Sequence, residues 1–148
     1  EICACLVGSE MCIRDSSYLE TNLKENNSSV KPVMADALEI CETFADGELD
    51  LIVSNPPYIK SADIETLQKE VRLEPRLALD GGEDGCDFYR EIVSRWSRKL
   101  KKGGALAFEL GENQADAVKA LMTDKGFSDF KISLDFGGVQ RAIIGTLL

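Results

Sequence analysis

Short apolar runs along the chain predict the strands of a sheet. Residues 51–53 form a compact run rich in β-branched side chains, which is typical of a buried parallel strand. Residues 105–110 have the same character, and residues 30–34 predict a shorter strand interrupted by Pro32. Apolar and polar residues alternate on both sides of Gly137-Gly138, so this region is expected to form an antiparallel hairpin.

Helical spacing between these runs predicts three helices, over residues 18–26, 88–100 and 113–125. We expect Asp87 to cap the second helix, and Ser61 to cap a helix that starts beyond residue 58. The side chains expected to face inward are Tyr89, Ile92, Val93 and Trp96 in the second helix, and Ala117, Val118, Leu121 and Met122 in the third. The order of elements predicts an α/β fold that ends in a hairpin.

The run at residues 51–53 is followed by Asn55-Pro56-Pro57-Tyr58. Prolines lack an N–H and fix φ, so the strand must end there in a stiff turn. Open α/β sheets bind ligands beyond the carboxyl ends of their strands. The Asn55 oxygen and the Pro56 carbonyl can accept hydrogen bonds in one plane, and Tyr58 offers a flat face. These features suit a planar NH2 group, although an ordinary turn is the alternative interpretation.

Composition narrows the candidate chemistry. The 148 residues suffice for one domain with a core, and the net charge of −9 argues against direct DNA binding. Histidine is absent and the five cysteines form no CxxC pair, so the sequence predicts neither a metal site nor a disulfide framework. No apolar run approaches the roughly 20 residues of a membrane span, and no signal peptide is recognisable. We therefore expect a cytoplasmic protein with reduced thiols.

Asn-Pro-Pro-Tyr after an apolar strand resembles the motif of methyltransferases that use S-adenosylmethionine to methylate amide or exocyclic amine nitrogens. Downstream residues narrow the resemblance to the HemK/PrmC family, the glutamine N(5)-methyltransferases of peptide chain release factors. The residues that carry it are Glu74-Pro75, Ala78-Leu79, Gly81-Gly82, Asp84-Gly85, Phe88-Tyr89-Arg90, Phe108-Glu109-Leu110-Gly111, Asn113-Gln114, Arg141 and Ile143-Ile144-Gly145.

This resemblance implies a Rossmann-like sheet, S-adenosylmethionine as cofactor and a release factor as protein substrate. It makes Asn55, Pro56, Pro57 and Tyr58 the catalytic residues that hold the glutamine of a Gly-Gly-Gln loop. Asp36, Ala37 and Asn55 would contact the cofactor, with Asp36 beside the adenine ring; a loop cap is an equally weighted interpretation of Asp36. Glu74 would support the neighbouring loop, or is an ordinary surface glutamate.

Two parts of the family pattern are missing from the sequence. No Gly-x-Gly-like loop precedes Asn55, and the family's small helical domain is absent. Residues 1–16 contain three of the five cysteines and resemble translated adapter-like sequence, with an edge strand over residues 2–7 as the structural alternative. We thus expect residues 17–148 to be a partial catalytic domain lacking the first strand. Other acceptors, such as a ribosomal-protein glutamine or a nucleic-acid adenine, stay open, as does a non-catalytic fragment.

Overall fold

The computed structural model describes residues 4–7 and 10–148, with side chains from Tyr18 onward except Met34. Its main sheet has the strand order β3-β4-β6-β5. The strands are β3 (Leu49–Ser54), β4 (Leu100–Glu109), β5 (Phe127–Leu134) and β6 (Gln140–Leu147). Strand β3 pairs parallel with β4, and β6 lies antiparallel between β4 and β5. The predicted α/β fold and terminal hairpin are confirmed.

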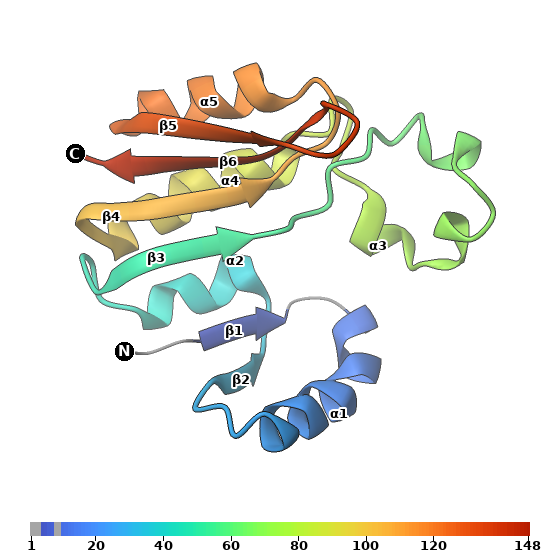
Figure 1. Ribbon diagram of the computed structural model, residues 1–148, viewed down its shortest axis with the longest axis horizontal. Coiled ribbons are helices and arrows are strands. Elements are labelled where there is room, and N and C mark those ends of the chain that lie inside the picture. Colours follow the sequence, from blue (N-terminus) through green and yellow to red (C-terminus); the bar gives the residue numbers. More distant parts are fainter. Residues whose placement is uncertain (1–3, 8–9) are drawn as a thin grey trace.

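A second, two-stranded sheet consists of β1 (Ala4–Val7) and β2 (Lys31–Met34), which pair in parallel. In the part of the chain that the structure describes, no ladder joins this sheet to β3. Figure 1 shows β1 between β2 and β3, with β1, β3 and β4 pointing the same way. The edge strand that was the alternative interpretation of residues 2–7 is present from Ala4, but it lies between β2 and β3 rather than at an edge, so a strand precedes β2 where the sequence predicted none; residues 2 and 3 lie outside the described part.

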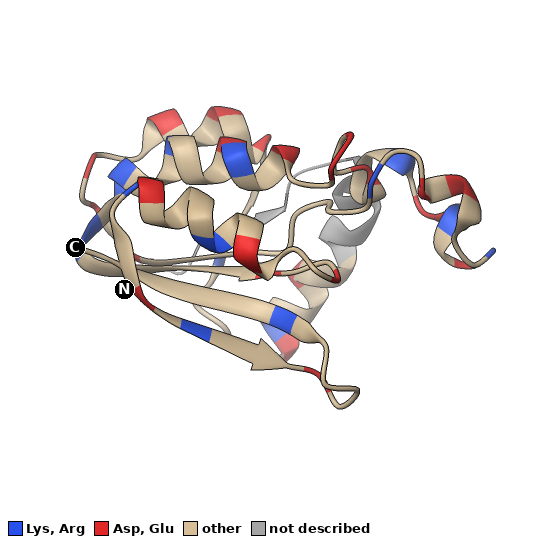
Figure 2. Cartoon of the chain, turned by 90° about the horizontal axis from the view of Figure 1, so that it is seen from above, with Lys and Arg blue, Asp and Glu red and all other residues tan. Residues whose placement is uncertain are grey.

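Helices α4 (Asp87–Trp96) and α5 (Ala115–Asp124) lie on one face of the main sheet (Figure 2). Their inner side chains pack against Leu106 and Phe108 of β4, which are fully buried. The predicted inner face of α4 is confirmed, with Tyr89, Ile92, Val93 and Trp96 all buried. In α5, Val118 and Met122 are buried and Leu121 is partly buried, but Ala117 is exposed and the prediction for it was wrong. Both signs of charge cover the outer sides of these helices.

Strand β3 corrects the expectation of a strand buried on both faces. Ile52 packs against the core, whereas Leu51 and Val53 are 54% and 70% exposed. Successive side chains in a strand point to opposite faces, so Leu51 and Val53 face away from α4 and α5. An apolar run shows that both faces of a strand tolerate burial. Whether both faces are buried depends on the elements that pack against the strand.

Several element boundaries also differ from the prediction. Helix α1 (Glu10–Glu25) begins eight residues before the expected start at residue 18. Helix α4 ends at Trp96 and continues as the 3-10 turn η4 (Ser97–Lys99). Asp87 is the first residue of α4 rather than its cap, and its carboxylate accepts from Arg90 of the same helix. Ser61 caps no helix, because its hydroxyl donates to Asp80 instead.

The segment between β3 and α4 forms short turns of helix that project from the body (Figure 1). They are η2 (Ile64–Thr66), η3 (Val71–Leu73) and α3 (Arg76–Leu79). Ile64 and Leu79 are buried, whereas Leu73 and Leu77 are exposed. The expectation of a structured loop beside the Asn-Pro-Pro-Tyr turn is therefore confirmed.

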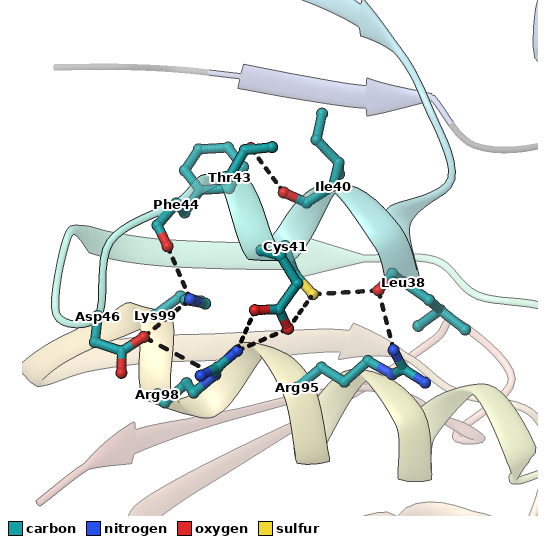
Figure 3. A network of polar contacts seen from close by, with 10 residues as sticks. Leu38, Ile40, Cys41, Thr43, Phe44, Asp46, Arg95, Arg98 and Lys99 are labelled. Carbon is teal, nitrogen blue, oxygen red and sulfur yellow. Dashed lines mark hydrogen bonds and ion pairs between the residues drawn. The ribbon is translucent and has the colours of Figure 1, made fainter.

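A polar network attaches helix α2 (Ala37–Ile40) and the turn η1 (Cys41–Thr43) to the end of α4 (Figure 3). Arg98 forms an ion pair with Glu42, with an N–O distance of 2.5 Å. The buried ammonium of Lys99 donates to the Phe44 carbonyl at 2.8 Å and to Asp46 at 2.9 Å. Trp96 donates its indole N–H to the Ala37 carbonyl at 2.9 Å. These contacts connect the segment after β2 to the main sheet.

The packing around β4 gives a stability prediction. Truncation of Leu106 to alanine would leave a cavity at the centre of the core, so we expect the free energy of unfolding to fall by about 2–5 kcal/mol. Leu73→Ala removes the same atoms from a side chain that is 80% exposed, and should change stability by no more than about 0.5 kcal/mol. Urea denaturation of both variants measures the difference. Equal losses would contradict the assigned core.

Candidate functional site

The Asn-Pro-Pro-Tyr turn follows β3 directly, at the carboxyl end of the parallel pair β3–β4. Asn55 is exposed, Pro56 is buried, and Pro57 and Tyr58 are half-buried. Within the described part of the chain, the Asn55 side chain has no hydrogen-bond partner. Its amide is therefore open to an outside group, at the edge where α/β sheets bind ligands.

Glycine backbone packs closely behind this turn. A Cβ on Gly81 would lie 2.8 Å from the Tyr58 Cα and 2.9 Å from the Pro57 oxygen. A Cβ on Gly111 would lie 2.9 Å from the Tyr58 ring. Gly85 has a φ of +79°, and a Cβ there would lie 2.5 Å from the carbonyl oxygen of Tyr58. Any side chain at these three positions would push the turn outward, so glycine is required by space, and at Gly85 also by backbone conformation.

Gln114, just before α5, occupies the centre of this packing and is only 7% exposed. Its Nε2 donates to the carbonyl oxygen of Tyr58 at 2.9 Å and to that of Gly85 at 3.2 Å. Its Oε1 accepts from the Gly111 N–H at 3.0 Å and, as the weaker branch of a shared bond, from the Tyr89 hydroxyl at 3.4 Å, which donates chiefly to the Glu109 carbonyl at 2.8 Å. The Nε2 end of the amide faces two carbonyl acceptors, and the Oε1 end faces two donors. The flipped orientation would place oxygen against oxygen, so only one orientation of the amide satisfies these groups.

The Tyr58 ring is held at its other end by Glu109, the last residue of β4. The Tyr58 hydroxyl donates to Glu109 Oε1 at 3.1 Å. Burial, then the charge of Glu109 and this hydrogen bond, raise the pKa of Tyr58, while Arg141 opposes the shift. Arg141 is itself paired with Asp135 of the hairpin at 3.0 Å. The hydroxyl is thus a neutral donor near pH 7, and the face of the ring is fixed in direction.

Asp80 organises the loop that contains Gly81, Gly82 and Gly85. It accepts from the Ser61 hydroxyl at 2.5 Å, from the Gly82 N–H at 3.1 Å and from Arg76 at 3.0 Å. The first two of these bonds are the main causes that lower the pKa of Asp80. Glu74 is exposed and has no side-chain partner among the described residues, so it does not support the loop by a contact.

Asp36 and Ala37 lie elsewhere, at the carboxyl end of β2. Asp36 is the N-cap of α2, and its Oδ1 accepts from the Leu38 N–H at 2.7 Å. The interpretation of Asp36 as a cap is therefore confirmed, and a role beside a cofactor stays a prediction. The Ala37 carbonyl is engaged by Trp96. The structure thus places the four predicted catalytic residues at the end of β3, and places Asp36 and Ala37 beyond the end of β2, at the start of α2.

The sequence relatives of the chain carry one name. The chain is 50% identical to the release factor glutamine methyltransferase of Geobacter sulfurreducens over 107 residues, 72% of this chain and 38% of the relative. It is 41% identical to that of Clostridium acetobutylicum over 132 residues, 88% of this chain and 44% of the relative. By sequence, this chain is a relative of the release factor glutamine methyltransferases. The chain spans less than half the length of these two relatives. No protein-family model matches it.

Solved structures agree with the fold. A methyltransferase from Pyrococcus furiosus matches with a TM-score of 0.68 at 21% identity, over 97% of this chain and 61% of that one. The release-factor-specific protein-(glutamine-N5) methyltransferase of Alicyclobacillus acidocaldarius matches with a TM-score of 0.50 at 25% identity, over 97% of this chain and 77% of that one. The predicted sheet of a SAM-dependent methyltransferase and the predicted family resemblance are confirmed.

The described residues carry neither a metal-binding cluster nor a membrane-spanning helix. They contain no group of three or more His, Cys, Asp or Glu side chains placed to hold a metal ion. They also contain no helix long and apolar enough to cross a membrane.

The site contains two side chains to which the sequence assigned no role, Gln114 and Glu109. Both lie in the stretch that carries the family resemblance, but no local pattern links them to a turn more than 50 residues earlier. Their position in the sequence could have indicated them, because Glu109 ends β4 and Gln114 follows it shortly after, and β4 is the strand next to β3.

The environment of Tyr58 predicts its titration. At pH 10, where an ordinary tyrosine is about half ionised, we expect Tyr58 to remain mostly protonated. Above that pH the unfolded chain binds fewer protons than the folded one, so this group lowers the free energy of unfolding as the pH rises. Glu109→Gln removes the neighbouring charge and should move the pKa of Tyr58 down, towards its ordinary value. Tyrosine ring carbon shifts in NMR report both values, and an unchanged pKa in the variant would contradict the contact.

Proposed function

We propose that this chain contains the acceptor-binding part of a protein-glutamine methyltransferase that modifies a peptide chain release factor with S-adenosylmethionine. The observation that carries the proposal is the open Asn55 amide at the end of β3, followed by a Pro-Pro-Tyr turn fixed from behind. The names of the sequence relatives support the substrate class. Release factors act in the cytoplasm, so we also propose that location.

The chemistry required of the chain is positional. A bound S-adenosylmethionine would supply an electrophilic methyl group on a sulfonium, and transfer breaks the S–C bond as the N–C bond forms. An amide nitrogen is a poor nucleophile because its lone pair is delocalised into the carbonyl. The Asn55 oxygen and the Pro56 carbonyl would accept the two amide N–H bonds and orient the nitrogen. Orientation of this kind is worth up to about 7–11 kcal/mol of a barrier.

The Tyr58 ring would pack on the plane of the acceptor amide. Its direction is set by the hydroxyl bond to Glu109 and by the carbonyl bond to Gln114. The nitrogen loses one proton to water during or after the transfer, so no strong base is needed. Asp36 and Ala37, at the end of β2, fit a role beside the adenine, since the Asp36 carboxylate is exposed and has one oxygen outside its cap bond.

Asn55→Ala tests the proposal. We suggest a chimera in which this chain replaces the matching segment of the Geobacter sulfurreducens relative, because that relative supplies the remaining length. With purified release factor as acceptor, the variant should lose about 100-fold or more in kcat, since one orienting acceptor is removed from the transition state. Binding of S-adenosylmethionine, measured by calorimetry, should change by less than about threefold if Asn55 acts mainly on the acceptor.

The matched control is Asn22→Ala, which removes the same side chain from the exposed surface of α1. Unchanged turnover in Asn55→Ala would refute the assigned role. Methylation of a ribosomal-protein glutamine or a nucleic-acid adenine in place of the release factor would support methyl transfer to a planar nitrogen but refute the release factor as the acceptor. No labelling of any acceptor by the unmutated chimera would favour a non-catalytic segment.

Binding of the cofactor by the chain itself is a separate prediction. The residues before Asn55 contain no Gly-rich loop, so we expect the 148-residue chain to bind S-adenosylmethionine more weakly than the chimera does. Calorimetric titration of both proteins measures this. Saturable one-to-one binding of equal strength would mean that other residues of this chain replace the loop.

A further inference from the structure

The Gln114 side chain connects two different parts of the molecule through the two ends of one amide. Its oxygen is bonded to Gly111, just beyond the end of β4, and to Tyr89 of α4. Its nitrogen is bonded to the carbonyls of Tyr58 and Gly85, which belong to the turn and to the loop behind it. The oxygen end thus rests on the core, and the nitrogen end reaches the site.

The nitrogen end acts next to two positions, Pro56 and Pro57, that have no backbone donor. Without these N–H groups the turn cannot form a ladder with a neighbouring strand. The carbonyl of Tyr58 would be left without a partner behind the turn if Nε2 were removed, because Gly81 and Gly85 pack too closely for a side chain to take its place. Together with the backbone bonds of the following residue, Ile59, to Leu79 and Gly81, this amide sets where the Tyr58 backbone lies.

We propose that Gln114 is the positioning residue of the acceptor site, and that its amide N–H bonds hold the Asn-Pro-Pro-Tyr turn at the depth needed for methyl transfer. The part of this inference that concerns catalysis rests on the proposed function. The part that concerns the position of the turn does not. Gln114 is buried behind the turn and acts through its bond to Tyr58.

Gln114→Glu separates the two ends of the amide. A carboxylate keeps the shape and can still accept from Gly111 and Tyr89, but it cannot donate to the two carbonyls. The lost bonds are therefore those to the turn and to the loop behind it, and the buried charge adds a desolvation cost of its own. Gln114→Met is the second variant, since it keeps the length of the side chain, carries no charge and removes all four bonds.

The first readout uses the 148-residue chain and requires no activity. The Ile59 N–H, next to Tyr58, donates to the Leu79 carbonyl at 3.0 Å, and the Gly81 N–H donates to the Ile59 carbonyl at 2.8 Å. In Gln114→Glu these two amides should exchange with solvent about tenfold faster or more, the size expected for loss of a buried hydrogen bond. Amides paired between β4 and β6 should keep their rates.

The second readout is steady-state kinetics in the chimera. We expect kcat to fall about 10-fold to 100-fold in Gln114→Glu, with KM for S-adenosylmethionine within about threefold of the unmutated value. A residue that only stabilised the fold would lower the melting temperature without this split between kcat and KM. Ser97→Ala is the matched control, because it removes a buried side-chain hydrogen bond to the Val93 carbonyl at the far end of α4.

The outcomes separate the inference from the proposed function. An unmutated chimera that methylates no release factor refutes the function, and the exchange rates still test the position of the turn. A folded Gln114→Glu protein with unchanged exchange at Ile59 and Gly81 and unchanged kcat overturns the inference. If Gln114→Glu and Gln114→Met both fail to fold, Gln114 is a residue of the core and the inference is also overturned.

Discussion

The turn after β3 must be held by groups outside itself, and much of the site follows from this constraint. Two successive prolines end the strand and remove two backbone donors, so the turn has little means of bonding its own neighbours. The partners come from Gln114 for the carbonyl and from Glu109 for the ring hydroxyl. Both lie at the carboxyl end of β4 or just beyond, because a parallel neighbour ends at the same edge of the sheet.

The same constraint explains the glycines of the loop before α4. Buried carbonyl groups need a hydrogen-bond partner. The Gln114 amide can serve those of Tyr58 and Gly85 only if the turn, the loop before α4 and the segment after β4 approach closely behind Tyr58. Gly81, Gly85 and Gly111 provide that approach, and the Asp80 carboxylate fixes the loop that carries the first two. The site is thus rigid on its inner side and open on the side of Asn55.

Strands and hairpin could be predicted from the sequence because their signal is local. The period of two over β5 and β6 and the glycines between them define a hairpin without knowledge of any other element. The two prolines likewise fix the end of β3 from within. The predicted fold and the place of the turn were correct for this reason.

The remaining features depend on partners distant in sequence. Gln114 reaches Tyr58 across 56 residues and Gly85 across 29. Ser61 looked like a helix cap because its neighbours allow one, but Asp80 competes for its hydroxyl. The exposure of Leu51 and Val53 depends on which elements cover each face of β3, and an apolar run alone carries no such information.

The two halves of the proposed site are held by different kinds of interaction. Asn55 to Tyr58 directly follow β3, which is paired with β4 in a sheet ladder, and the Tyr58 carbonyl is held by the buried Gln114 amide. Asp36 follows β2, which has no ladder to β3 among the described residues, so its position relative to Asn55 depends on α2 and its contacts with α4. Those contacts are the indole bond of Trp96, the packing of Phe44 on the Trp96 ring, the buried Lys99 ammonium on the Phe44 carbonyl, and an exposed ion pair between Arg98 and Glu42 that is screened by solvent. The acceptor side is therefore built into the main sheet, whereas the relative placement of the cofactor side depends on Trp96 and its neighbours.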